Sequence, residues 1–237
     1  MQPRSRFVAR LGLADGVTAA NAALGFLAAA LASVSPSLAA RLVLLAAVAD
    51  GLDGVLAEYT GGTPVGEFLD SLADVASFCV APALFVFWIA YEGWSLSFAE
   101  PTIEMVVALF VPALFVVTGV IRLGLYTAYD VERGVTEGAQ TTLAATVLAA
   151  GYLAGVHTPL LFLVATAVFA GLMVAPVTYA DLRARDALVM GVVQAGAIVV
   201  PDLFFRLFPR LLCICALGYL ILGPRLYRTT GRKSPPR

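Results

Sequence analysis

Two neighbouring segments dominate this sequence: Asp50-Gly-Leu-Asp53-Gly-Val-Leu-Ala57 and Gly66-Glu-Phe-Leu-Asp70-Ser-Leu-Ala-Asp74. They place a group of carboxylates between apolar stretches that are long enough to cross a bilayer. An ionised Asp at membrane depth is costly, so a group of them requires compensating positive charge. The two segments therefore predict a functional site that holds cations.

The spacing of the carboxylates predicts how they meet. Asp50 and Asp53 are three positions apart and share one face of a helix. Asp70 and Asp74 are four positions apart and share a face of the next helix. If the two faces meet, Asp50, Asp53, Asp70 and Asp74 are the expected ligands of two Mg²⁺ or Mn²⁺ ions, which prefer carboxylate oxygens. Glycines beside them leave room for a substrate: Gly51, Gly54 and Gly66.

The composition indicates an all-α polytopic membrane protein. The chain has 237 residues, of which 60% are hydrophobic and only 13% are charged, whereas an ordinary soluble domain is about 25% charged. The net charge of −1 offers no basic surface for nucleic acid. The three cysteines stand in apolar segments without a C-x-x-C pair, so we expect buried free thiols at Cys79, Cys213 and Cys215.

Apolar segments separated by polar turns predict a bundle of about eight transmembrane helices within residues 1–224, followed by a basic cytoplasmic tail at 225–237. The predicted spans are 17–34, 38–58, 66–92, 102–128, 140–156, 158–176, 187–201 and 207–223. Asp15 fits a cap of the first helix. His157 stands alone in a turn and is expected to be a polar cap rather than a catalyst.

The distribution of basic residues predicts the orientation. With both termini on one side, that side carries Arg4, Arg6, Arg10, Arg133, Arg183, Arg185 and the cations of the tail. The other side carries Arg41, Arg206 and Arg210. The positive-inside rule then places both termini and the acidic segments in the cytoplasm.

The motif D-x2-D-G-x2-A, followed by G-x3-D-x3-D, resembles the signature of the CDP-alcohol phosphotransferases. The run from Leu69 to Ala83 is similar to the serine branch of that family, and the likeness covers roughly residues 15–130. It implies a six-helix catalytic core with two further C-terminal helices, and a homodimer. It also implies transfer of a lipid phosphate from a CDP-activated lipid to an alcohol, with release of CMP.

The resemblance also implies residue roles. Asp74 is expected to remove the proton of the attacking alcohol. Gly54, Ala57, Thr63 and Gly66 are expected to line the cytidine-diphosphate pocket. One position departs from the family pattern, because Glu58 stands where an Arg usually helps to hold the donor phosphates. Arg122 is a candidate to replace that charge.

Several residues keep two interpretations. Thr18 and Asn21 share a helix face with Gly25, which suits either helix packing or contact with the nucleotide. Arg122 either extends to the membrane interface or binds an anion in the site. Thr63 either contacts the donor or caps a helix. Glu67 is expected to complement a helix dipole rather than bind a ligand.

Serine is the predicted acceptor because phosphorylated alcohols carry a dianion and require a cluster of basic residues. On the active-site side the embedded cation is Arg122, with Arg133 nearby. A second hypothesis keeps the family and transfers the same group to glycerol phosphate or inositol phosphate. A third is a catalytically impaired homologue, because Glu58 replaces the usual Arg. A transporter with a carboxylate relay is a hypothesis of a different class, disfavoured because the carboxylates gather near one face of the membrane.

Overall fold

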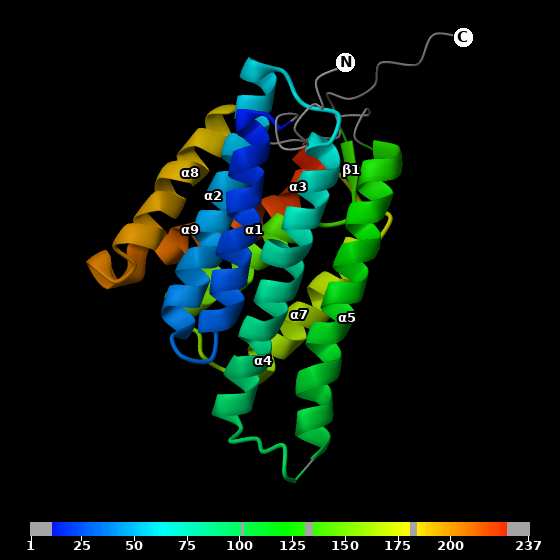
Figure 1. Ribbon diagram of the computed structural model, residues 1–237. Helices are drawn as coiled ribbons and strands as arrows, with labels where there is room; N and C mark the ends of the chain where they lie inside the picture. The colour runs from blue at the N-terminus through cyan, green and yellow to red at the C-terminus, as the bar shows by residue number, and fades with distance from the viewer. Residues whose placement is uncertain (1–10, 101, 131–134, 181–183, 227–237) are drawn as a thin grey trace, which may run out of the picture.

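The protein is a bundle of helices, seen here in a computed structural model that describes residues 11–100, 102–130, 135–180 and 184–226 (Figure 1). Helices form at each of the predicted apolar segments. Their bounds are α1 Leu13–Leu31, α2 Pro36–Thr60, α3 Gly66–Asp74, α4 Ala81–Gly93, α5 Ile103–Leu125, α6 Thr141–Leu153, α7 Pro159–Met173, α8 Ala184–Val199 and α9 Leu203–Leu226.

Two of the long helices contain π-helical turns. Segment η2, Val75–Val80, joins α3 to α4, so that Gly66–Gly93 forms one interrupted rod. Segment η3, Tyr126–Asp130, extends the end of α5. A π turn widens the helix and re-aims the side chains around it, and such turns are frequent at functional sites. Both segments lie close to the conspicuous charged residues Asp74 and Arg122.

Two short strands were not expected from the sequence. Strand β1, Val135–Glu137, pairs antiparallel with β2, Thr178–Ala180, with Thr136 opposite Tyr179. Next to this pairing the backbone N–H of Gly138 donates to the carbonyl of Val177 at 2.8 Å. The pair joins the α5–α6 and α7–α8 connections, which the sequence indicated only as polar loops.

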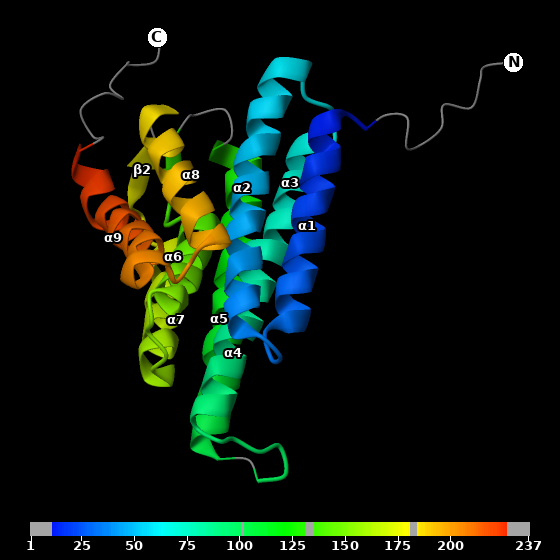
Figure 2. The ribbon, with the colours of Figure 1, turned by 90° about the vertical axis from the view of Figure 1, so that its left-hand side faces the viewer.

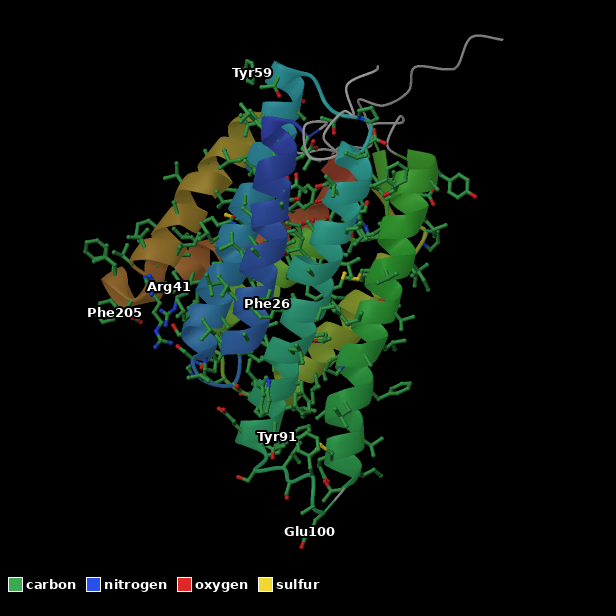
Figure 3. The ribbon with its side chains drawn as sticks, in the orientation of Figure 1. Phe26, Arg41, Tyr59, Tyr91, Glu100 and Phe205 are labelled. Carbon is green, nitrogen blue, oxygen red and sulfur yellow. The ribbon has the colours of Figure 1, made fainter. Side chains whose placement is uncertain are left out.

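The membrane assignment agrees with the surface of the bundle. Within the described residues, Leu13–Leu31, Gly66–Gly93, Ile103–Tyr129 and Leu203–Pro224 are long and apolar enough to cross a bilayer, and shorter apolar helices accompany them. Apolar side chains such as Phe26, which is 69% exposed, point outward from the bundle (Figure 3). The number of spans stays a prediction.

Close helix contacts position α1 against the interrupted rod. A Cβ atom at Gly25 would lie 2.6 Å from the backbone Cα of Ser77, so only glycine allows this approach. The hydroxyl of Ser77 donates to the backbone carbonyl of Asn21 at 2.8 Å across the same contact. Gly25 therefore serves close helix packing, which was one of the two interpretations of the face that it shares with Thr18 and Asn21.

Two sequence expectations need correction. Asp15 lies within the first turn of α1 rather than before it, although it does cap the helix start: its carboxylate accepts a 2.7 Å hydrogen bond from the N–H of the N-cap residue Gly12. Cys79 is buried, but Cys213 is only partly buried and Cys215 is exposed, because α9 turns that face away from the bundle.

The single histidine lies in the turn between α6 and α7, as the sequence indicated. The ring of His157 packs against Tyr152 with 4.6 Å between centroids. It is distant along the chain from both acidic segments, and it does not line the pocket that they form.

Candidate metal and substrate site

Three of the predicted carboxylates converge. One oxygen from each of Asp50, Asp70 and Asp74 lies within 4.8 Å of the others. Asp50 comes from α2, whereas Asp70 and Asp74 come from one face of α3, as the four-residue spacing predicts. Oδ1 of Asp74 is buried without a hydrogen-bond partner among the described residues. Hard oxygen ligands at this separation, with one of them unsatisfied, fit a divalent cation.

Asp53 stands slightly apart from this cluster. Its carboxylate is buried, and its Oδ2 accepts a 2.6 Å hydrogen bond from the hydroxyl of Thr18 on α1. Three of the four expected ligands therefore lie together, and their role as ligands stays a prediction. Asp53 is nevertheless a neighbour of the cluster, since it lines the same pocket as Asp50 and Asp70.

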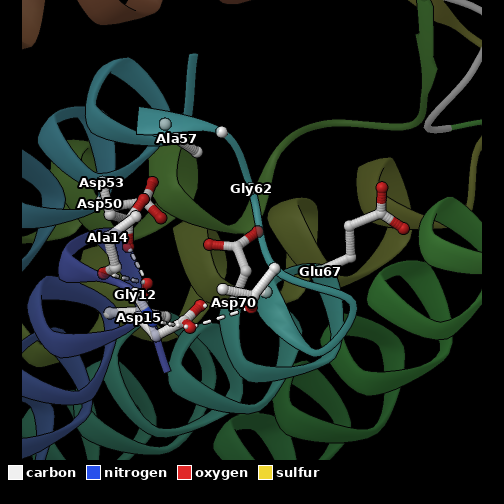
Figure 4. Close-up of a pocket in the computed structure, with 14 residues that line it drawn as sticks. Gly12, Ala14, Asp15, Asp50, Asp53, Ala57, Gly62, Glu67 and Asp70 are labelled. Carbon is white, nitrogen blue, oxygen red and sulfur yellow. Dashed lines mark hydrogen bonds between the residues drawn. The ribbon is translucent and has the colours of Figure 1, made fainter. Parts of the chain in front are cut away.

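The pocket itself has a volume of about 420 Å³ and lies at the end of the bundle where α1 begins and α2 ends (Figure 4). Among the residues expected to contact the nucleotide, it is lined by Thr18, Gly54, Ala57, Thr63 and Gly66. A Cβ atom at Gly54 would meet no atom within 4 Å, so this glycine faces open space. A pocket of this size is in the range of small-molecule sites.

Thr63 connects the rim of the pocket to α1. Its hydroxyl donates to the carboxylate of Asp15, at 2.9 Å from Oδ2 and 3.1 Å from Oδ1. The helix-cap interpretation of Thr63 is wrong, since the N-cap of α3 is Val65 and no side chain caps that end. Sequence reasoning missed Asp15 as a pocket residue because its partner is distant along the chain.

Asn21 and Asp74, both predicted site residues, lie outside the pocket lining. Asn21 is completely buried, and both polar atoms of its side-chain amide lack a partner among the described residues. Asp74 lies behind Asp50 and Asp70 rather than on the lining. Glu67 does line the rim, but its carboxylate points away from the others in Figure 4.

Arg122 is buried beside the acidic cluster. Its side chain is 7% exposed and lies over the ring of Tyr126, with 5.4 Å between Cζ and the ring centroid. It is also close enough to Asp74 for electrostatic interaction. The guanidinium is therefore inside the protein and does not extend to its surface. Glu58, in contrast, is exposed and absent from the pocket lining.

A second hydrogen-bonded pair holds the helix that carries Asp70. The hydroxyls of Ser71 on α3 and Thr127 on η3 are 2.5 Å apart. The Thr127 hydroxyl also lies 2.9 Å from the backbone carbonyl of Leu123, to which it donates. Ser71 is then the donor to Thr127, and the π-helical turn supports the position of α3.

The fold and the site together define a polytopic membrane protein with an acidic pocket, suited to divalent cations, at one end of its helices. The chain belongs to the CDP-alcohol phosphatidyltransferase family, whose sequence pattern matches residues 11–181. This confirms the family indicated by the two acidic segments.

Curated relatives are similar to parts of the chain. The archaetidylserine synthase of Methanothermobacter thermautotrophicus is 31% identical over 155 residues, which cover 63% of this chain and 61% of the relative. The CDP-diacylglycerol–serine O-phosphatidyltransferases of two Helicobacter pylori strains are each 39% identical over 90 residues, which cover 38% of this chain and 34% of the relatives. The chain thus spans less than two thirds of the length of the curated relatives it matches.

Proposed function

We propose that the protein transfers a lipid phosphate group from a CDP-activated lipid to the hydroxyl of serine and releases CMP. In this reaction the serine oxygen forms a bond to the lipid-linked phosphorus while the bond from that phosphorus to the CMP oxygen breaks. The convergence of Asp50, Asp70 and Asp74 within 4.8 Å, in a chain of this family, is the observation that carries the proposal.

The carboxylates of the motif would hold two divalent ions, Mg²⁺ or Mn²⁺. Asp50, Asp70 and Asp74 form the closest set, and Asp53 completes it from the same pocket. Such ions supply charge neutralisation for a diphosphate and its leaving group. The hydrogen bond from Thr18 fixes the orientation of Asp53 and leaves its second oxygen for a ligand.

The residues in and around the pocket have different roles in binding and proton transfer. Gly54, Ala57, Thr63 and Gly66 provide a wall with little side-chain bulk against which a cytidine diphosphate fits. Asp74 accepts the proton of the serine hydroxyl, since its Oδ1 has no other partner among the described residues. Asn21 would complete the polar region from α1, because a buried amide without partners is costly unless a ligand or water satisfies it.

The charge near the cluster favours serine as the acceptor. Among the side chains that the structure describes, Arg122 is the cation beside Asp74, whereas Arg41 donates to the carbonyl of Ile198 and Arg206 pairs with Asp202. One guanidinium matches the single carboxylate of serine, while a phosphate dianion calls for more. The names of the relatives support the same acceptor.

The orientation and assembly complete the proposal. The active site and both termini face the cytoplasm, and two copies form a homodimer. The orientation rests on the positive-inside count. Arg4, Arg6, Arg10, Arg133, Arg183 and the tail after Leu226 lie outside the described residues, as do the side chains of Arg185 and Arg225.

The test is acceptor competition with purified protein. CDP-lipid is incubated with labelled serine, glycerol phosphate or inositol phosphate in the presence of Mg²⁺ or Mn²⁺, and the labelled lipid and CMP are measured. Serine-dependent CMP release with a serine-labelled lipid product supports the proposal. Exclusive use of a phosphorylated alcohol would overturn the choice of acceptor but keep the family reaction.

A further inference from the structure

A second, uncharged cavity of about 680 Å³ lies on the neighbouring face of α2. We call it the α2–α8 groove; its walls are α2, α6 and α8, with Tyr219 of α9 at one edge. On α2 it uses Val48, Gly51 and Leu52, whereas Asp50, Asp53 and Gly54 line the acidic pocket. The two cavities therefore lie back to back along the same turns of one helix.

The wall formed by α8 is fixed to α2 by polar contacts. Nε2 of Gln194 donates to the backbone carbonyl of Leu44 at 2.7 Å, and Arg41 donates to the carbonyl of Ile198 near the end of α8. Figure 2 shows α8 lying beside α2. These contacts hold α8 in place as a wall of the groove, and α8 lies beyond the residues that match the family.

The groove has space and chemistry for a hydrocarbon chain. Cβ atoms at Gly51 and Gly191, on facing walls, would meet no atom within 4 Å. None of the residues that line it carries a charge. Leu52 and Val55 on its α2 wall are 52% and 50% exposed, so the groove opens toward the surroundings of the bundle, which for a membrane protein are lipid.

One end of the groove lies beside Asp50 of the acidic cluster. Thr142 lines the groove, and its side chain lies close to the carboxylate of Asp50. Gln140 stands beside it at the start of α6, so the polar lining is richest where the groove approaches the cluster. A ligand with a diphosphate at Asp50 can extend an apolar chain into the groove along α2.

We propose that the α2–α8 groove binds one hydrocarbon chain of the CDP-activated lipid, with α8 as the wall that sets the preference for chain length. The polar end near Thr142 accommodates the oxygen atoms that join chain to headgroup. This inference rests on the proposed function, because the headgroup must occupy the acidic pocket.

The test narrows the groove without touching the acidic cluster. In Gly191→Phe a ring projects from α8 into the open space, and we expect KM for a long-chain CDP-lipid to rise by about tenfold, the equivalent of roughly two lost buried methylene contacts. For a short-chain CDP-lipid, KM and kcat stay at the wild-type values. Gly171→Phe on α7 is the matched control, since its Cβ also faces open space but lies outside the groove.

A second readout does not depend on turnover. A long-chain CDP-lipid with a photoreactive group on its chain is expected to label α8 in the wild-type protein and to lose that labelling in Gly191→Phe. Two competition results would overturn the inference by showing that the groove holds bulk lipid. In the first, an excess of unmodified CDP-lipid fails to prevent the labelling. In the second, ordinary phospholipid prevents it equally well. Equal loss of activity with both chain lengths would overturn it too. A wild-type protein that uses neither donor but labels α8 would contradict the proposed function alone.

Discussion

The hydroxyl of Thr18 donates a 2.6 Å hydrogen bond to Oδ2 of Asp53, the motif carboxylate that lies outside the set of three that converge. It joins α1 to α2 at the wall of the acidic pocket. A residue that the sequence suggested as a nucleotide contact thus also orients an acidic group of the motif.

Removing this hydroxyl should weaken the site without abolishing it. We expect Thr18→Val to lower kcat/KM for CDP-lipid by about tenfold, because a hydrogen bond to a charged group contributes roughly 1.5–3 kcal/mol. The kinetics are measured across a range of Mn²⁺ concentrations. Thr166→Val is the control, since the Thr166 hydroxyl donates to the carbonyl of Phe162 in its own helix. Equal effects of both substitutions would show that the Thr18 contact has no special role.

The acidic residues should differ sharply in importance. Asp50→Asn and Asp70→Asn are each expected to lower kcat by a factor on the order of 10² to 10³, the cost of removing one preorganised electrostatic contact at a reacting phosphate. Glu67→Gln should stay within about threefold of the wild type, because its carboxylate points away from the cluster. Mn²⁺ binding followed by electron paramagnetic resonance provides a readout independent of turnover. Retained Mn²⁺ affinity in Asp50→Asn would refute its role as a ligand.

We expect Asp15 and Thr63 to be energetically coupled. Asp15→Asn and Thr63→Val are each expected to raise KM for CDP-lipid, because they release the segment between α2 and α3 from α1. A double-mutant cycle should give a coupling free energy of about 0.5–3 kcal/mol. Additive effects would mean that the two residues contact the donor independently.

The close approach of α1 to η2 predicts a stability effect. In Gly25→Val even the Cβ atom would lie 2.6 Å from the Ser77 backbone, so we expect a loss of about 1–3 kcal/mol in the free energy of unfolding. Thermal unfolding in detergent measures it. Gly16→Ala on the same helix meets no atom within 4 Å and should be neutral or slightly stabilising. A fall in Tm of the same size in both variants would contradict the packing explanation.

The sequence predicted the parts of the site that depend on helical periodicity. The spacing of Asp70 and Asp74 placed both on one face, and the glycines around Asp53 indicated open space, because both follow from positions within one helix. The apolar segments likewise predicted where the helices form, since their lengths match a bilayer.

What the sequence missed depends on contacts between distant segments. Nothing in the local pattern shows that Thr63 bonds to Asp15, or that Thr18 holds Asp53, since helix crossing geometry decides these pairs. The π turn at 75–80 also leaves no periodic signal of its own. Strands β1 and β2 are too short for an alternating pattern to be recognised.

The most direct test of the proposed reaction is CMP release from CDP-lipid by the wild-type protein and by Asp74→Asn, each with and without serine and divalent metal. We predict that wild-type release requires both additions, and that the variant retains the wild-type Tm but releases CMP at least about a hundredfold more slowly. Release by Asp74→Asn at the wild-type rate, or wild-type release that needs neither serine nor metal, would contradict the proposed reaction.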